Sequence, residues 1–304
     1  MPDLPVFFLD TPLPEPYVEL IAGRALMVGP DDADLARADA IIAGAKRPWN
    51  ADAFALAERT RVISRVGVGY DNVDVAAATA VGIVVCNTPF GPTVSTAEHT
   101  IALMMAIGRE LPAQQARARE GLPGSPVGTA LEFDERTLGL IGYGRIARRV
   151  GAVGLALGMR VVAYDPYISS AGAVELVSLP ELLADSDVIS LHAPATSETH
   201  RLIDAAAMAA MKRGVLLVNC ARGGLIDPDA LLAALDSGQV GGAGLDVTDP
   251  EPLPVGHALL THPRVIVTPH IASATVAGRR RLYQQAIDNA FDVLAGRPAT
   301  TVEV

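Results

Sequence analysis

The chain has 304 residues, of which 50% are hydrophobic and 19% are charged, and this length suffices for two domains with their own cores. Its net charge of −10 at pH 7 argues against nucleic acid as a direct partner, because neutralisation of phosphates dominates that affinity. No apolar run is long enough to cross a bilayer, so no membrane contact is expected, since charged residues or glycines interrupt every hydrophobic stretch.

The amino-terminal segment and the cysteines indicate a compartment. The segment MPDLPVFFLDTPLP has neither the basic start nor the sustained apolar core of a secretory signal. Cys86 and Cys220 lie in apolar, strand-like contexts, as reduced thiols of cytosolic proteins do, and a disulfide between them is the alternative. We therefore expect a cytoplasmic protein.

In the first third of the chain, short β-branched runs alternate with alanine-rich helical segments, which is typical of parallel α/β sheets. A helical stretch over 97–119, with a break near Pro112, then leads into a glycine- and proline-rich loop over 121–128. The strands predicted before this stretch are Val6–Leu9, Ala25–Val28, Ile41–Ala43, Val62–Val66 and Ile83–Cys86.

The middle of the chain restarts the alternation, with runs apolar enough for strands that are covered on both faces. A last helix over 275–295 ends at Gly296 and Pro298, which are stop signals. Two alternating series predict two doubly wound domains and not one large sheet. The predicted strands of the second series are Thr137–Ile141, Arg160–Tyr164, Val174–Val177, Val188–His192, Val215–Asn219, Gly242–Asp246 and Val265–Thr268.

Gly142 and Gly144 belong to a Gly-x-Gly-x-x-Ala turn that follows a predicted strand and opens a predicted helix. Such a turn lets the backbone approach a pyrophosphate, which then lies at the positive end of the helix. Ala147 takes the third position, which accepts Gly or Ala because it serves close packing of helix on strand. Asp165 ends the next strand, where a carboxylate can bind a ribose diol and would repel a 2′-phosphate. The pattern favours NAD over NADP; the alternative is an ordinary turn with an unrelated Asp.

Arg222, Glu251 and His270 each follow the carboxyl end of a predicted strand of the second series. Open α/β sheets bind ligands at that edge, so the three side chains should meet at the nicotinamide end of the cofactor. The Arg can clamp a carboxylate and polarise a carbonyl, and the His can exchange a hydroxyl proton. A carboxylate beside the His favours its charged form. Taken singly, they also read as a surface ion pair, a solvated loop carboxylate and a structural histidine.

In the first series, the strand over 62–66 runs into Gly67, Val68 and Gly69 and then into a helical pattern. N–H groups exposed at such a turn bind anions, and the alternative is a plain turn. No metal is expected, because the other histidines show no metal-ligand spacing with cysteines or carboxylates. These histidines are His99, His192, His200, His257 and His262.

With these residues, the sequence resembles the D-isomer-specific 2-hydroxyacid dehydrogenase family. The resemblance extends from about Val62 to Pro298 and is weaker before Val62. Several motifs in the same order make it specific. They are RVGVGYDNVD (65–74), NTP (87–89), TAEHTIALMM (96–105), TLGLIGYGRIA (137–147), LHAP (191–194), NCARGGLID (219–227), DVTDPEP (246–252) and VTPHIASAT (267–275).

The resemblance implies an NAD-dependent oxidoreductase that moves a hydride between nicotinamide and C2 of a small, anionic D-2-hydroxy or 2-keto acid. It implies Arg222, Glu251 and His270 as the catalytic set. Implied substrate contacts are Val68, Gly69, Arg65 and again Arg222. The implied cofactor contacts are Gly142, Gly144, Arg145, Ile146, Asp165, Thr96, His192, Pro194, Cys220 and Asp246, the last at the nicotinamide carboxamide.

The resemblance also implies a domain layout. Residues 1–97 and 273–304 would form a flavodoxin-like α/β substrate domain, and residues 98–272 a Rossmann-type, doubly wound NAD-binding domain. Region 98–130 would build the two-fold interface of a homodimer. No regulatory domain is expected after the last helix.

Among the branches of the family, the 3-phosphoglycerate dehydrogenases look most similar, through AYDPYIS (163–169) and RVGVGYDNVD. Arg65 lies where that branch places a phosphate-binding arginine, or else it makes an ordinary strand-end salt bridge. Residues 41–44 lack a second arginine of that branch, and the direction of the nearby Lys46 and Arg47 is open. Reduction of glyoxylate or hydroxypyruvate is an equal contender. An alternative of another class is an NAD(H)-sensing binding protein, similar to the corepressors built on this scaffold.

Overall fold

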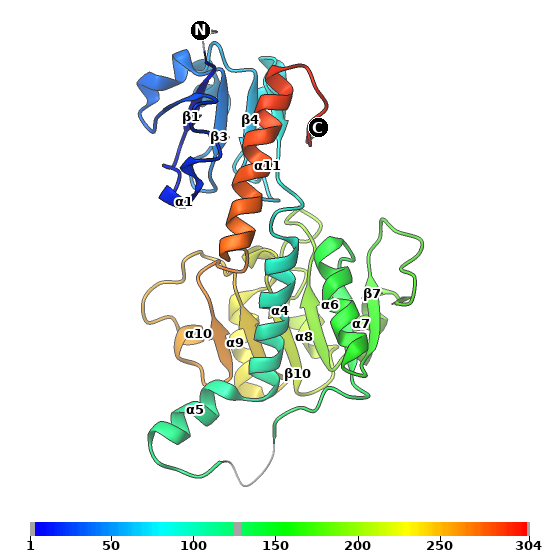
Figure 1. Ribbon diagram of the computed structural model, residues 1–304. Helices are drawn as coiled ribbons and strands as arrows, with labels where there is room; N and C mark the ends of the chain where they lie inside the picture. Colours follow the sequence, from blue (N-terminus) through cyan, green and yellow to red (C-terminus); the bar gives the residue numbers. More distant parts are fainter. Residues whose placement is uncertain (1–3, 125–128, 303–304) are drawn as a thin grey trace. The chain divides into compact units, whose positions relative to one another are not determined.

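The computed structural model describes residues 4–124 and 129–302 and divides the chain into two compact units. The first unit joins the residues up to Thr93 to the segment from Ala274, and the second is Val94–Ser273. Each unit holds a parallel β-sheet with helices on both faces (Figure 1). The predicted α/β class with two doubly wound sheets is therefore confirmed.

The sheet of the first unit has five parallel strands in the order β2-β1-β3-β4-β5. This is the flavodoxin-like strand order. All five strands lie where the sequence predicts them, to within one residue at each end. They are β1 (Val6–Leu9), β2 (Leu26–Val28), β3 (Ala40–Ala43), β4 (Val62–Arg65) and β5 (Val84–Cys86).

Neighbouring side chains of a strand point to opposite faces, so Phe7 and Phe8 belong to two different cores of the first unit. Phe7 packs on the face covered by α1 and α11, and Phe8 on the face covered by η1, α2 and α3. The last helix of the chain therefore completes the first core. The helices are α1 (Glu15–Val18), η1 (Asp32–Arg37), α2 (Ala51–Ala55), α3 (Val75–Ala80) and α11 (Val276–Leu294).

The sheet of the second unit has seven parallel strands in the order β12-β11-β10-β9-β6-β7-β8. The chain order reverses between β6 and β9, which is the switch point where Rossmann-type sheets bind dinucleotides. β11 begins two residues earlier than predicted. Its register against β10 shifts at Gly241, which packs against the backbone of Gly214, where a side chain would not fit. The strands are β6 (Thr137–Ile141), β7 (Arg160–Tyr164), β8 (Glu175–Leu176), β9 (Val188–Leu191), β10 (Val215–Asn219), β11 (Val240–Leu245) and β12 (Val265–Val267).

The helical stretch predicted over 97–119, with a break near Pro112, is two helices, α4 (Thr93–Gly108) and α5 (Leu111–Arg119). They are separated at Glu110, whose φ of 54° is left-handed. Pro112 lies in the first turn of α5, where a missing N–H breaks no helical hydrogen bond. The break therefore precedes the proline. Of the predicted loop over 121–128, residues 125–128 lie outside the described part.

Helices α4 and α6 cover one face of the seven-stranded sheet, and α7, α8 and α9 cover the other. Across residues 4–124 and 129–302, no helix combines the length and the apolar character that a membrane span requires. The remaining helices of the second unit are α6 (Arg145–Ala156), α7 (Leu179–Asp185), α8 (Ala205–Ala209), η2 (Gly223–Leu225), α9 (Pro228–Ser237) and α10 (Ala258–Thr261).

Candidate active site

The glycine-rich turn joins β6 to α6 at the switch point of the second sheet. Gly142 has a φ of 85°, and a Cβ there would lie 2.9 Å from the backbone carbonyl of His192, so the position requires glycine. Gly144 is the N-cap of α6, where a Cβ would meet no atom within 4 Å. No side chain caps this helix end, and Arg145 and Ile146 form its first turn. Uncapped N–H groups beside open space are suited to a pyrophosphate.

Asp165 follows β7 and is tied to the glycine-rich turn. Its Oδ2 accepts the N–H of Tyr143 at 2.9 Å, and its Oδ1 accepts the N–H of Tyr167 at 3.0 Å. Each carboxylate oxygen can accept a further hydrogen bond, as a ribose diol would require. The structure thus fixes a negative charge beside the turn, where it disfavours a 2′-phosphate.

Four further predicted cofactor residues lie in the second unit. His192 and Pro194 follow β9, Cys220 follows β10, and Thr96 is buried in the first turn of α4. Burial lowers the pKa of His192 to about 4. Burial also raises the pKa of Cys220 to about 12. Both side chains are therefore neutral at pH 7, and neither brings a charge to this part of the sheet edge.

Arg222 lies in a turn that Asn219 shapes at the end of β10. The Asn219 amide donates to the carbonyl of Arg222 at 2.8 Å and accepts the N–H of Ala221 at 3.0 Å. A Cβ at Gly223 would overlap the carbonyl oxygen of Thr248, so this turn packs directly against the loop that leads to Glu251. Asn219 opens the NCARGG motif, but no role was predicted for its side chain.

His270 and Glu251 form the expected pair. The Nδ1 of His270 lies 2.7 Å from the Oε1 of Glu251, and the side chains are 49% and 40% exposed. Because an ionised carboxylate only accepts, Nδ1 carries the hydrogen, and Nε2 is left to exchange a proton with a substrate. The pair is half-exposed, so solvent screens its attraction.

Asp246 is buried directly after β11, with 1% of its surface exposed. Its Oδ1 accepts the hydroxyl of Thr268 at 2.6 Å and the N–H of Ile271 at 2.9 Å, and its Oδ2 accepts the N–H of Ala272 at 2.8 Å. Its carbonyl accepts the N–H of His270 at 2.8 Å. Asp246 therefore holds the loop that carries His270, a role that its expected contact with nicotinamide does not describe.

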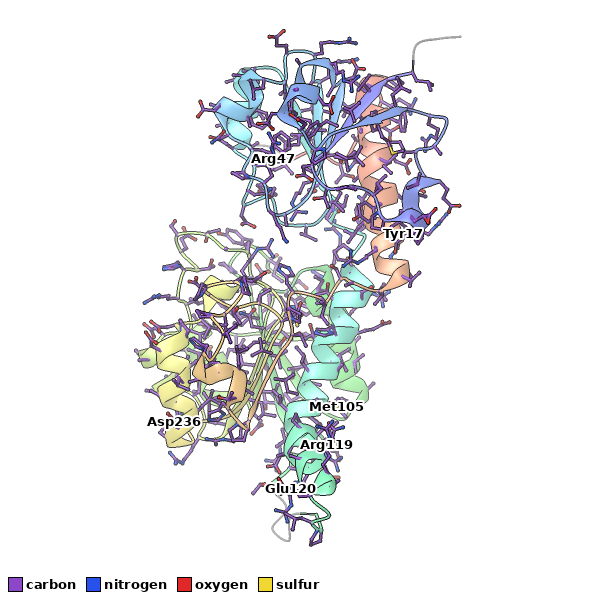
Figure 2. All side chains as sticks on the ribbon, turned by 90° about the vertical axis from the view of Figure 1, so that its left-hand side faces the viewer. Tyr17, Arg47, Met105, Arg119, Glu120 and Asp236 are labelled. Carbon is purple, nitrogen blue, oxygen red and sulfur yellow. The ribbon has the colours of Figure 1, made fainter. Side chains whose placement is uncertain are left out.

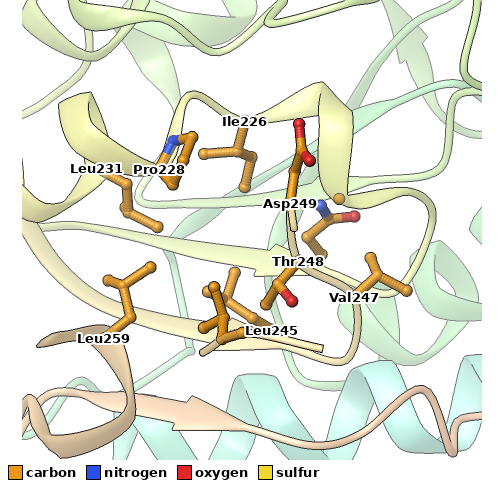
Figure 3. Close-up of a pocket in the computed structure, with 11 residues that line it drawn as sticks. Ile226, Pro228, Leu231, Leu245, Val247, Thr248, Asp249 and Leu259 are labelled. Carbon is orange, nitrogen blue, oxygen red and sulfur yellow. The ribbon is translucent and has the colours of Figure 1, made fainter. Parts of the chain in front are cut away.

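A small hollow lies next to the Arg222 turn (Figure 3). Its walls are mostly apolar and include Ile226, Leu231, Leu245 and Leu259. Arg222, Glu251 and His270 do not line it. The hollow is therefore a packing gap between α9 and β11 and not a place for a charged substrate.

In the first unit, the turn with Val68 and Gly69 follows β4 and is tied to residues 87 and 88. Gly67 donates its N–H to the hydroxyl of Thr88 at 2.7 Å, and the Asn87 amide donates to the carbonyl of Val68 at 2.7 Å. Among the hydrogen bonds of the described residues, none uses the N–H of Val68 or Gly69. The turn is thus held from one side while both N–H groups are left for a ligand.

Two arginines near this turn already have partners within the protein. Arg65 is 9% exposed, and its guanidinium donates to the amide oxygen of Asn72 at 3.2 Å and to the carbonyl of Val66. Arg47, labelled in Figure 2, pairs with Asp32 at 2.7 Å and lies 4.4 Å from the centre of the Trp49 ring. Lys46, in contrast, is exposed.

These observations define the class of the protein: a dinucleotide-binding α/β protein with polar side chains gathered at the carboxyl ends of its strands. Within the described residues, no group of three or more His, Cys, Asp or Glu side chains is placed to hold a metal ion.

Comparison with known proteins identifies the family. The model of the D-isomer specific 2-hydroxyacid dehydrogenase NAD-binding domain matches residues 101–272, which is more than half of the chain. The chain belongs to the D-isomer-specific 2-hydroxyacid dehydrogenase family, and its second unit contains the NAD-binding domain. The predicted family and the predicted cofactor, NAD, are confirmed.

Individual relatives agree with this assignment. The D-3-phosphoglycerate dehydrogenase of Mycobacterium bovis is 41% identical over 276 residues, which are 88% of this chain and 52% of that protein. The chain thus spans about half the length of the curated relatives it matches, and the predicted similarity to this branch is confirmed. A glyoxylate reductase from Paecilomyes thermophila has a TM-score of 0.90 at 29% identity, covering 99% of both chains. The D-lactate dehydrogenase of Aquifex aeolicus, solved with NAD and lactic acid, has a TM-score of 0.85 at 30% identity, covering 96% of both chains.

Two alanine substitutions should separate the roles of the two glycines. Gly142→Ala should lower Tm and weaken NADH binding, because a Cβ at that φ would press on the backbone of His192. Gly144→Ala should leave Tm unchanged, because its methyl group would meet no protein atom. It should weaken NADH binding by about tenfold, since the methyl group would occupy the space into which the pyrophosphate is expected to bind. Thermal melts and titrations of NADH fluorescence measure both effects.

Gly124→Ala is the matched control, because its Cβ also meets open space, and it should change neither quantity. Full NADH affinity in Gly144→Ala would show that the pyrophosphate does not approach this position.

Proposed function

We propose that the chain is an NAD-dependent oxidoreductase that transfers a hydride between nicotinamide and C2 of a small D-2-hydroxy or 2-keto acid. The observation that carries the proposal is the 2.7 Å hydrogen bond between His270 and Glu251. This pair lies at the same sheet edge as Arg222 and the glycine-rich turn. The names of the family and of its relatives support the same chemistry.

Each unit contributes residues of its own to the proposed reaction, with residues 1–97 and 273–304 serving the substrate and residues 98–272 the cofactor. In the first unit, the N–H groups of Val68 and Gly69 bind the substrate carboxylate. In the second, the guanidinium of Arg222 contacts the carboxylate and polarises the C2 carbonyl. Bound NAD supplies the hydride chemistry.

Proton transfer falls to His270 in this proposal. In the reducing direction, its Nε2 donates a proton to the C2 oxygen, and in the oxidising direction it takes the hydroxyl proton. Glu251 accepts the Nδ1 hydrogen, which fixes the ring and leaves Nε2 to exchange the proton. Asp246 lies under the same loop and serves the nicotinamide carboxamide.

Two substrate types suit the family, phosphoglycerate and glyoxylate or hydroxypyruvate, and the engaged arginines favour the unphosphorylated acids. A phosphate would have to draw the Arg65 guanidinium away from Asn72, or Arg47 away from Asp32. Asn72 is half-buried, so the loss of its partner has a cost that the phosphate contacts would have to offset. The side chain of Asp32 is 60% exposed, so water can replace its partner.

A panel of 2-keto acids with NADH tests the proposed reaction and the proposed substrate preference, because turnover lowers the NADH absorbance. We expect turnover with glyoxylate or hydroxypyruvate and a kcat/KM at least about tenfold lower for phosphohydroxypyruvate, because the nearby arginines are engaged. A preference for phosphohydroxypyruvate would contradict the choice of substrate alone. NADH binding without turnover of any 2-keto acid would indicate the NAD(H)-sensing alternative.

His270→Ala should lower kcat by about 10²–10⁴-fold, because no other group then supplies the proton, while the affinity for NADH stays within about twofold. Arg222→Lys should lower kcat/KM strongly, since a point charge replaces a planar, bidentate fork. Steady-state kinetics and NADH titrations give both results. Unchanged turnover in His270→Ala would remove His270 from the mechanism, and near-normal efficiency in Arg222→Lys would remove the clamp.

We also propose a homodimer built through region 98–130, of which residues 125–128 lie outside the described part. α5 buries none of its nine residues within this chain, and Leu111 is 54% exposed. Figures 1 and 2 show α5 extending from the body of the second unit, with Arg119 and Glu120 near its end. A helix without buried residues gains little stability from its own chain, so a second copy is the partner we propose. We also propose a cytoplasmic location, which the two free cysteines suit, because a reducing compartment keeps thiols unpaired.

Leu111→Asp should shift the protein from dimer towards monomer, because the exposed leucine would lose its apolar contact in the interface. Sedimentation velocity at several concentrations measures the shift. Leu260→Asp is the control, since Leu260 is 45% exposed on α10 and should leave the oligomeric state unchanged. A monomeric wild-type protein would contradict the proposed dimer.

A further inference from the structure

A row of three polar side chains connects α4 to the loop that carries His270. The Nε2 of His99 lies 3.0 Å from the hydroxyl oxygen of Thr268, which lies 2.6 Å from the Oδ1 of Asp246. The Nε2 of His99 also lies 3.4 Å from the Oδ1 of Asp246. The Asp246 side chain is fully buried, and that of His99 is 21% exposed. The row lies wholly within the second unit.

The chemistry of the three groups fixes the direction of these hydrogen bonds. An ionised carboxylate can only accept, so the hydroxyl of Thr268 gives its single hydrogen to Asp246. The Thr268 oxygen must then accept its second bond, and the Nε2 of His99 must donate it. His99 is therefore the donor at the start of the row.

The row ends at the backbone of the His270 loop. Asp246 accepts the N–H groups of Ile271 and Ala272 with its two carboxylate oxygens, and its carbonyl accepts the N–H of His270. His270 has a φ of 52°, in the left-handed region. Residues other than glycine adopt this backbone conformation only at a cost of about 1–2 kcal/mol. The hydrogen bonds to Asp246 offset this cost, so the orientation of Asp246 decides where the imidazole of His270 lies.

We infer that His99 is a positioning residue for His270, acting through Thr268 and Asp246. This inference rests on the proposed role of His270 in proton transfer. By donating to Thr268, His99 holds the hydroxyl in the orientation that binds Asp246. Asp246 in turn keeps residues 270–272 in their turn. In this inference, His99 does not contact the reacting atoms.

Two variants of His99 test the inference, because they differ in which imidazole nitrogen they imitate. The amide nitrogen of Gln reaches about as far as Nε2, whereas that of Asn matches Nδ1. His99→Asn should therefore lower kcat by about tenfold, as expected for the loss of one half-buried hydrogen bond, with KM and NADH affinity within about twofold of wild type. His99→Gln should keep most of the wild-type kcat.

Thr268→Val tests the middle of the row, because it removes the hydroxyl at nearly constant volume. It should lower kcat about as much as His99→Asn. The double variant should lose little more kcat, since both changes remove the hydrogen bond between His99 and Thr268. Thr261→Val on α10 is the matched control, because its hydroxyl bonds only to its own helix, and it should leave kcat unchanged.

Hydrogen exchange supplies a readout that does not depend on activity. In His99→Asn, but not in His99→Gln, the amides of Ile271 and Ala272 should exchange faster, because Asp246 holds both. This pattern would support the positioning role even if no 2-keto acid were reduced and the proposed function failed. Equal behaviour of the Asn and Gln variants, or a loss confined to NADH affinity, would overturn the inference.

Discussion

The buried carboxylate of Asp246 is the interaction on which the site of the second unit depends. A carboxylate in the interior is costly unless donors surround it, and here the donors are the Thr268 hydroxyl and the N–H groups of residues 271 and 272. The need to satisfy one buried charge thus folds the loop after β12 into a tight turn. The left-handed backbone of His270 is a consequence of that turn. The same loop brings His270 within 2.7 Å of Glu251.

Close backbone packing brings the other loops of this sheet edge together. Gly142 lies against the backbone of His192, and Gly223 lies against the carbonyl of Thr248. In both places the neighbour is backbone, which cannot move aside as a flexible side chain could. The loops after β6 and β9 therefore support one another, and so do the loops after β10 and β11. The functional side chains on these loops are therefore anchored to the sheet, which keeps their positions fixed as a binding or catalytic site requires.

The sequence allowed the sheets and the motif residues to be predicted, because both depend on local patterns. Apolar runs located the strands, and glycine spacing located the dinucleotide turn. The break between α4 and α5 was predicted near Pro112, and it lies just before that residue, at Glu110, where a non-glycine residue adopts a left-handed φ that no sequence pattern marks. His99 and Thr268 were missed as partners because 169 residues separate them. Their contact exists only once α4 packs beside β11 and β12.

The first unit offers neutral groups for binding the anionic acid that we propose as substrate, although the chain has a net charge of −10. Its arginines near the β4 turn are held by Asn72 and Asp32, so the charge they carry is already shared with protein groups. The N–H groups of Val68 and Gly69 are neutral, and they are fixed by bonds from Asn87 and Thr88 to the same turn. Fixed backbone dipoles attract an anion at short range without any excess of positive charge. Recognition of a carboxylate by such a turn therefore depends on the geometry of a few N–H groups, and it is compatible with an acidic surface elsewhere.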